Sequence, residues 1–271
     1  MDTFSSIYLG IIQGATEFLP ISSSGHLVLF QNLLGFREPQ LLLDSSLHLG
    51  TLMAICLYFH SDLKNMIRET WKFTVDLCHR RSSLKSIEDQ PYASLTLWVL
   101  LGTVPTLVIG LVFRSFLENL FGSVTGVGIM LVITGLILAV TKLIPDDYGR
   151  REEVALLIAL AIGTAQGIAL IPGISRSGTT IVCGMICGLK RDLAARFSFL
   201  LSIPAIIGAV VFQLSAEGVD RIGLMPLTSG FISAAFVGLI ALKILMGLVR
   251  KGNLSYFAPY CWALGLFMVF K

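Results

Sequence analysis

The sequence predicts an all-α polytopic membrane protein. Of its 271 residues, 55% are hydrophobic and 14% are charged, whereas soluble domains carry about 25% charged residues. Its apolar runs approach the roughly 20 residues that a helix needs to cross a hydrocarbon core. They do not alternate apolar and polar residues, as the strands of a membrane barrel do. Because helices satisfy their backbone hydrogen bonds within each segment, we expect a bundle of membrane helices.

The apolar runs locate the predicted elements along the chain. Six runs are long, at residues 41–59, 93–113, 122–143, 154–171, 197–214 and 224–249. Three are weaker or interrupted by polar residues, at 4–36, 179–189 and 257–270. We therefore expect one integral membrane domain covering residues 1–271.

Basic residues predict how this domain is oriented. The polar insert 61–90 holds six Lys or Arg. Further basic loops contain the residues Lys142, Arg150, Arg151, Lys190, Arg191, Arg196, Arg250 and Lys251, while the connections at Arg114 and Arg221 hold one each. The positive-inside rule places the rich loops in the cytoplasm, where they would contact anionic lipid headgroups. The net charge of +3 is spread over loops, which does not indicate a nucleic-acid partner.

Two polar interruptions resemble each other. "ISSSG" at residues 21–25 recurs as "ISRSG" at 174–178, and Gln13-Gly14 recurs as Gln166-Gly167, both after 153 residues. The topology prediction brings the first interruption in from the outer face and the second from the inner face. We therefore expect an inverted-topology repeat with halves 1–143 and 152–271. Its two broken hairpins should meet near the middle of the membrane.

The interruptions hold most of the intramembrane polar groups. They are Gln13, Glu17, Ser22, Ser23, Ser24 and His26 from the first, and Ser175, Arg176, Ser177, Thr179 and Thr180 from the second. Ionisable groups at this depth are costly unless they are paired or hydrated. We therefore expect Glu17, His26 and Arg176 to face one another or a wet cavity.

These residue types indicate a phosphate site. Helices that begin after Ser24 and Ser177 would direct their N-terminal N–H groups at an anion, and Arg176 adds a planar, bidentate donor. The i, i+3 spacing from Ser23 to His26 would allow the histidine to activate the hydroxyl. Gln13 and Glu17, at i and i+4, could present oxygens to a hard divalent cation, with phosphate completing its shell.

The two motifs "QGATEFLPISSSGHL" (13–27) and "PGISRSGTT" (172–180) resemble the signatures of the undecaprenyl-diphosphate phosphatase family, bacterial enzymes linked to bacitracin resistance. The similarity also includes "LHLGTLMAI" (47–55) and "RDLAARFSFLLSIPAIIGA" (191–209). It extends over essentially the whole chain. The family's first motif has Glu or Gln followed four residues later by Glu, and this chain has the Gln form.

The resemblance implies hydrolysis of a C55 isoprenyl diphosphate to its monophosphate, which recycles the carrier lipid for cell-wall synthesis. It implies a multi-pass protein of the bacterial inner (plasma) membrane, with an active site open to the outer face and a divalent cation, Mg²⁺ or Ca²⁺. Oligomeric state is left open, a homodimer included.

The roles carried over from the family fall on residues of both motifs. Ser23 would be the nucleophile or hold the attacking water, His26 the acid/base residue, and Glu17 a metal or proton partner. Gln13 is a second candidate metal ligand and also a candidate substrate-binding residue. Arg176 would bind the diphosphate, together with the hydroxyl groups of Ser22, Ser24, Ser175, Ser177 and Thr180.

One alternative function, and one further candidate residue, accompany this prediction. Inverted repeats with broken helices are also transporter architecture, so a prenyl-phosphate flippase could bind the same headgroup without cleaving it. The pairing of Ser23 with His26 beside Glu17 favours an enzyme. His48 could carry a second proton, but we expect it to pack between helices.

Overall fold

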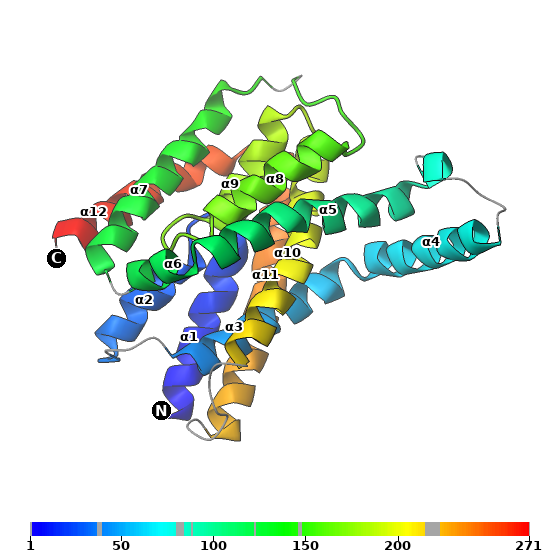
Figure 1. Cartoon of the computed structure of the whole chain (residues 1–271). Coiled ribbons are helices and arrows are strands. Elements are labelled where there is room, and N and C mark those ends of the chain that lie inside the picture. Colours follow the sequence, from blue (N-terminus) through cyan, green and yellow to red (C-terminus); the bar gives the residue numbers. More distant parts are fainter. Residues whose placement is uncertain are drawn as a thin grey trace.

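The computed structural model is helical (Figure 1). It describes residues 2–36, 40–79, 84–87, 89–121, 123–145, 148–214 and 223–270. Arg80, Arg81 and Arg221, which the topology prediction uses, lie outside these ranges. The α-helices are α1 (Thr3–Phe18), α2 (Ser23–Leu33), α3 (Leu41–Tyr58), α4 (His60–Cys78), α5 (Pro91–Val112), α6 (Arg114–Phe121), α7 (Val124–Ala139), α8 (Leu156–Ile168), α9 (Arg176–Ile186), α10 (Arg191–Leu214), α11 (Leu224–Arg250) and α12 (Ala258–Phe270). Short 3₁₀ helices are η1 (Leu84–Ile87), η2 (Val140–Leu143) and η4 (Leu254–Phe257).

Several helices are long and apolar enough to cross a membrane. Within the described residues there are four: Pro91–Val112, Val124–Leu143, Arg191–Val211 and Leu224–Arg250. A fifth candidate is the pair formed by α3 and α4, which is bent by 76° between Tyr58 and His60. The protein is therefore an all-α, multi-pass membrane protein, as predicted. Its orientation in the membrane stays a prediction.

Two helix pairs are broken at the polar motifs. The elbow between α1 and α2 is formed by residues 19–22, and the elbow between α8 and α9 by residues 169–175. Helices α2 and α9 have 11 residues each, or roughly 16 Å at 1.5 Å per residue. That length is well short of a hydrocarbon core of about 30 Å. Both segments are therefore broken hairpins, as the sequence predicts.

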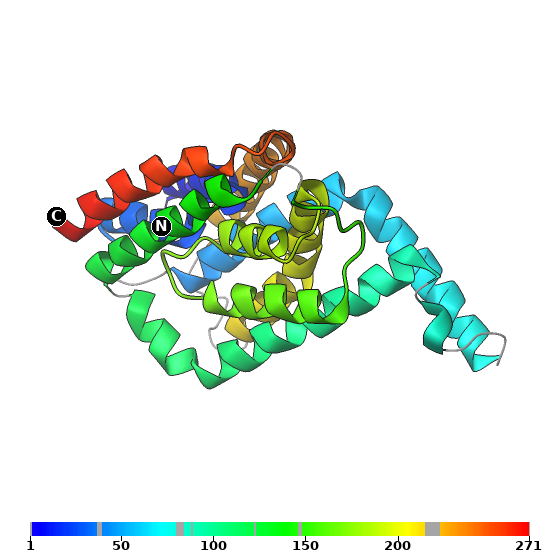
Figure 2. The ribbon, with the colours of Figure 1, turned by 90° about the horizontal axis from the view of Figure 1, so that it is seen from above.

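The two hairpins pack in corresponding ways on the rest of the bundle. Helix α1 packs on α11 and α3, while α8 packs on α5. Helices α2 and α9 both contact α7, which lies beside α12 in both views (Figures 1 and 2). This shared contact with α7 brings the two elbows together. The inverted relation of the complete halves stays a prediction.

Glycines allow the closest of these helix contacts. A Cβ atom at Gly10 would lie 2.5 Å from the carbonyl oxygen of Gly230, and one at Gly163 would lie 1.8 Å from that of Gly102. No real Cβ atom fits at such distances from backbone. Gly10 and Gly163 therefore permit α1 to approach α11 and α8 to approach α5, in the manner of small residues at membrane helix interfaces.

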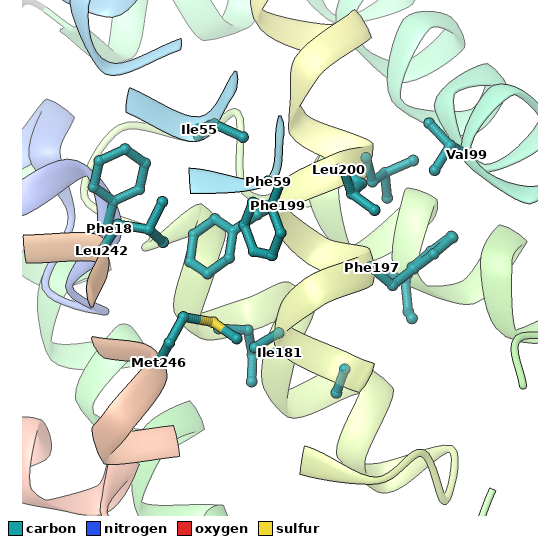
Figure 3. Packing of buried hydrophobic residues seen from close by; sticks show 14 of the residues in the cluster. Phe18, Ile55, Phe59, Val99, Ile181, Phe197, Phe199, Leu200, Leu242 and Met246 are labelled. Carbon is teal, nitrogen blue, oxygen red and sulfur yellow. The ribbon is translucent and has the colours of Figure 1, made fainter. Parts of the chain in front are cut away.

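A buried aromatic cluster lies beside the first elbow (Figure 3). The Phe18 ring centroid lies 5.7 Å from that of Phe199, which lies 6.2 Å from that of Phe59. These rings join the end of α1 to α10 and to the junction of α3 with α4. Phe18 follows Glu17 directly, so apolar packing holds the end of α1 that carries this carboxylate.

The structure differs from the sequence prediction in two details. The polar insert 61–90 was predicted as a loop, but most of it is helix α4, which projects from the bundle beside the start of α5 (Figures 1 and 2). Met66 and Phe73, seven residues apart on α4, are buried, and this one-sided apolar spacing is easily hidden among charges. Helices α2 and α9 also begin two residues earlier than predicted.

Candidate active site between two helical elbows

The first elbow is a tight turn closed by a serine cap. The Ser22 hydroxyl accepts a hydrogen bond from the Gly25 N–H at 3.2 Å, so Ser22 caps α2. Its φ of 66° is the one positive value at a non-glycine among the described residues. A non-glycine residue in this region is strained and persists where surrounding contacts hold it. The predicted binding residue Ser22 therefore shapes the backbone, and it is buried.

The second elbow uses the same cap and a glycine. The Ser175 hydroxyl accepts from the Gly178 N–H at 3.1 Å. Thr134 of α7 donates its hydroxyl proton to the Gly173 carbonyl at 2.9 Å and accepts from the Ser175 N–H at 2.9 Å. Gly173 has a φ of +95°, and a Cβ atom there would lie 2.3 Å from the Val127 carbonyl oxygen. Glycine is therefore required at this position.

The two elbows touch each other through reciprocal contacts. The Gly173 N–H donates to the Ser24 hydroxyl at 3.4 Å, and the Ser177 hydroxyl donates to the Leu19 carbonyl at 3.4 Å. Each serine comes from one elbow and each backbone group from the other. The elbows thus meet directly, as predicted.

Glu17 is the centre of the polar cluster where they meet. Its Oε1 is paired with Arg176, 159 residues away. Its Oε2 accepts from Ser23 Oγ at 2.6 Å and from Gln13 Nε2 at 2.9 Å. The Glu17 side chain is only 4% exposed, and a carboxylate at such a site is stable only when it is paired and hydrogen-bonded. Three donors from two hairpins meet this requirement.

Gln13 links this carboxylate to a histidine of α3. The same amide nitrogen that donates to Glu17 lies 2.9 Å from His48 Nδ1, and His48 Nδ1 lies 3.7 Å from Glu17 Oε2. His48 is part of the cluster, which corrects the expectation that it only packs between helices. The Gln13 Oε1 atom is buried and has no hydrogen-bond partner.

His26 does not pair with Ser23. Its Nδ1 lies 2.8 Å from the Ser22 carbonyl oxygen and its Nε2 lies 2.7 Å from the Tyr260 hydroxyl. Because the ring bonds to the carbonyl four residues earlier, it lies along α2. Ser23, in the first helical turn, donates instead to Glu17. We also expected His26 to face Glu17 and Arg176, but its two ring nitrogens bond to Ser22 and Tyr260 instead.

The other hydroxyl groups of the motifs mostly bond to neighbouring groups within the elbows and helices. The hydroxyl oxygens of Ser175 and Ser177 lie 3.3 Å apart, and so do those of Ser22 and Ser24. The Thr180 hydroxyl donates to the Arg176 carbonyl at 2.7 Å. Thr180 also contacts Ser198 of α10. Partial exposure is found at Ser23, Ser24, Thr179, Arg176 and His48, although the Thr179 hydroxyl oxygen itself is buried. An incoming ligand could touch the partly exposed residues first.

His48 and Tyr260 are the residues that sequence reasoning undervalued or missed. "LHLG" carries a histidine in an apolar run, which is a weak signal. Tyr260 follows a proline at the start of the last apolar run and is separated from His26 by 234 residues. Nothing local in the sequence connects it to the first motif.

The fold and this cluster define a class: a multi-pass helical membrane protein with a charged site where two broken hairpins meet. The chain belongs to the family described as Bacitracin resistance protein BacA, whose model matches residues 6–267.

Similar proteins cover almost the whole chain. One from Desulfatibacillum aliphaticivorans is 44% identical over 262 residues, covering 96% of this chain and 95% of the relative. Another, from Halothermothrix orenii, is 42% identical over 276 residues, covering 99% and 98%. One from Desulforapulum autotrophicum is 41% identical over 274 residues, also covering 99% and 98%. Each carries the name undecaprenyl-diphosphatase.

Proposed function

We propose that this protein hydrolyses undecaprenyl diphosphate to undecaprenyl phosphate and inorganic phosphate, and so recycles the lipid carrier for cell-wall synthesis. Its family and the names of its relatives support this activity. The observation that carries the proposal is the cluster in which Glu17 joins Ser23 of its own hairpin to Arg176 of the other. It combines a hydroxyl, a carboxylate and a guanidinium, which can supply a nucleophile, a proton acceptor and charge compensation for phosphate transfer.

Arg176 is the proposed phosphate anchor. Its guanidinium has donors for a phosphate oxygen in addition to the one that faces Glu17, because the planar fork carries five N–H groups. Helices α2 and α9 both begin where the two elbows meet. Their N-terminal N–H groups favour an anion at that point. A diphosphate headgroup bound between the elbows would thus find its charge compensated from both hairpins.

Ser23 and Glu17 are the proposed reacting pair. With Ser23 Oγ 2.6 Å from Glu17 Oε2, the carboxylate is within reach to accept the hydroxyl proton. If Ser23 attacks, its Oγ forms a bond to the terminal phosphorus while the bridging P–O bond breaks and the lipid monophosphate leaves. Water then cleaves the phosphoserine and releases phosphate. If Ser23 instead holds a water molecule, Glu17 accepts that water's proton and the same P–O bond breaks.

His26 stays the proposed acid/base residue. It would exchange its proton through Nε2, and it does not contact Ser23. Ser24 is proposed to bind a phosphate oxygen, because this residue is partly exposed. Ser22, Ser175, Ser177 and Thr180 are buried, and we assign them to shaping the elbows that hold the binding groups.

A divalent cation, Mg²⁺ or Ca²⁺, fits this site in part. Gln13 Oε1 is a buried oxygen without a partner, and Glu17 supplies a carboxylate four residues away. Among the described residues, no group of three His, Cys, Asp or Glu could hold a metal ion. Phosphate oxygens of the substrate would therefore have to complete the shell. When bound, the cation would neutralise charge on the diphosphate.

We further propose that the protein lies in the inner (plasma) membrane with its site open to the outer face. The Lys/Arg-rich connections support this orientation through the positive-inside rule. Cysteine-free protein carrying one new cysteine at Ser123 or at Lys251, both exposed, provides a test by membrane-impermeant labelling. Exterior labelling is expected at Ser123 alone, and the reverse pattern would overturn the orientation.

The activity is tested with purified protein and a long-chain prenyl diphosphate, by measuring phosphate release. We expect release that depends on Glu17, with the Glu17→Ala variant as the control. If the wild type releases no more phosphate than the variant, the proposal is overturned. The remaining candidate function is then a flippase, which binds the headgroup without cleaving it.

A further inference from the structure

We propose that Tyr260 of α12 is a positioning residue that fixes the ring orientation and the tautomer of His26. This inference rests on the proposed function, because it concerns how His26 is prepared to exchange a proton. The contact joins the last helix of the chain to the first polar motif, across 234 residues.

The Ser22 carbonyl determines which nitrogen of His26 is free. A carbonyl oxygen only accepts hydrogen bonds, so His26 Nδ1, 2.8 Å from it, must carry a hydrogen atom. The neutral ring then has a bare Nε2. Every proton that His26 gains or loses during turnover therefore passes through Nε2, the atom that faces Tyr260.

The Tyr260 hydroxyl is placed for this nitrogen. It lies 2.7 Å from Nε2, and the planes of the two rings differ by only 4°. At this distance the hydroxyl can donate its proton to the lone pair of the bare Nε2. A phenol can also accept from an N–H. Tyr260 thus remains a partner of His26 in both protonation states without a change of rotamer.

Helix α12 is anchored where this contact forms. The neighbouring residue, Cys261, is buried, and its Sγ lies 3.7 Å from the Pro20 carbonyl oxygen at the first elbow. Adjacent residues of α12 therefore contact the elbow and the histidine that follows it. Tyr260 as a whole is 47% exposed, so this residue lies at the edge of the protein core.

The kinetic test uses Tyr260→Phe, which keeps the ring and removes the hydroxyl. We expect kcat for phosphate release to fall about tenfold, the scale of one lost hydrogen bond, with KM changed less than about twofold. Tyr256→Phe is the matched control, because Tyr256 is 71% exposed on η4 at the same end of α12. It should leave both constants unchanged.

A double substitution separates positioning from general support of the fold. If Tyr260 acts through His26, Tyr260→Phe should cause no further loss in a His26→Gln background. A full tenfold loss in that background, or an unchanged kcat in the single variant, would overturn the proposal. Comparable thermal unfolding of the wild type and Tyr260→Phe shows that the protein remains folded.

A spectroscopic test does not depend on turnover. The chain has four histidines, so the ¹⁵N imidazole signals that disappear in His26→Gln belong to His26. In the wild type they should report hydrogen on Nδ1, and Tyr260→Phe should introduce a mixture of tautomers. Hydrogen on Nε2 in the wild type, or the same spectrum in both proteins, would contradict the assignment. If the wild type releases no phosphate, the proposed function fails, while this experiment still decides the tautomer.

Discussion

The two elbows share a serine cap and contact each other, but they differ in chemistry. Each has a capping serine, Ser22 or Ser175, three residues before a glycine, and each is bonded at equivalent places to the other. The same offset of 153 residues, however, relates Glu17 to Leu170, Ser23 to Arg176 and His26 to Thr179. The first elbow therefore supplies the acid, the hydroxyl and the histidine, and the second supplies the cation. Two elbows with the same serine cap thus carry different parts of one site.

The two motif glutamines show the same division. Gln13 donates to Glu17 and approaches His48, whereas Gln166 donates to Thr106, which donates to the Gly163 carbonyl. Both have a buried Oε1 without a partner. One glutamine thus belongs to the polar cluster and the other to a helix contact, although the sequence around them is similar.

The largest effect is expected for Arg176→Lys, which tests the part contributed by the second elbow. An ammonium keeps the charge but cannot reproduce the planar fork, so we expect phosphate release to fall roughly 100-fold. Arg250→Lys is the control, because Arg250 forms an exposed ion pair with Asp192 at the C-terminal end of α11. This control should keep the wild-type rate. Near wild-type turnover for Arg176→Lys would exclude the anchor role.

Ser23→Ala compared with Ser24→Ala sharpens the role of the first elbow. Ser23 donates to Glu17, whereas Ser24 accepts from the Gly173 backbone. We expect Ser23→Ala to lower kcat by up to about 100-fold if the serine attacks, and Ser24→Ala mainly to raise KM. A ³²P-labelled substrate would label a covalent serine intermediate in the wild type. Equal losses from the two substitutions would contradict the division of roles.

Gln13→Ala and Gln166→Ala test whether the two glutamines differ as the contacts indicate. Removing Gln13 deprives the buried Glu17 of one donor, and we expect about a tenfold loss of kcat. Gln166→Ala should lower the unfolding temperature while leaving kcat per folded molecule within about twofold. The comparison requires thermal unfolding and phosphate release on the same preparations. An opposite pattern would mean that the second elbow also takes part in the reaction.

The smallest effect is expected for His48→Asn. The Asn side chain can still accept a hydrogen bond from the Gln13 amide, which holds that amide against Glu17, so we expect at most about a threefold loss of kcat. His48→Leu removes the acceptor and should approach the loss seen for Gln13→Ala. If Asn and Leu are equally damaging, His48 acts through its own proton and not by holding Gln13.

Much of the fold was predictable because its signals are local. Apolar runs gave the spans of α5, α7, α10 and α11, and the matching motifs gave both elbows and their contact. The contact between Glu17 and Arg176 was also predictable, since a charge in an apolar segment needs a partner. Helix α4 was missed because Met66 and Phe73 are sparse among charged residues. The predicted pair of Ser23 and His26 was wrong as a contact, because spacing along a helix does not determine the rotamer of either side chain.

The sequence by itself determined the membrane helices, the two breaks and the residues able to meet there. The hydropathy of a segment and its proline and glycine residues affect only a few neighbouring residues. Their effects can therefore be predicted from the order of residues alone. The tertiary structure decided which groups became partners: Ser23 with Glu17, Gln13 with His48, and His26 with Tyr260. These pairings depend on side-chain directions and on helices separated by up to 234 residues, which no local pattern encodes.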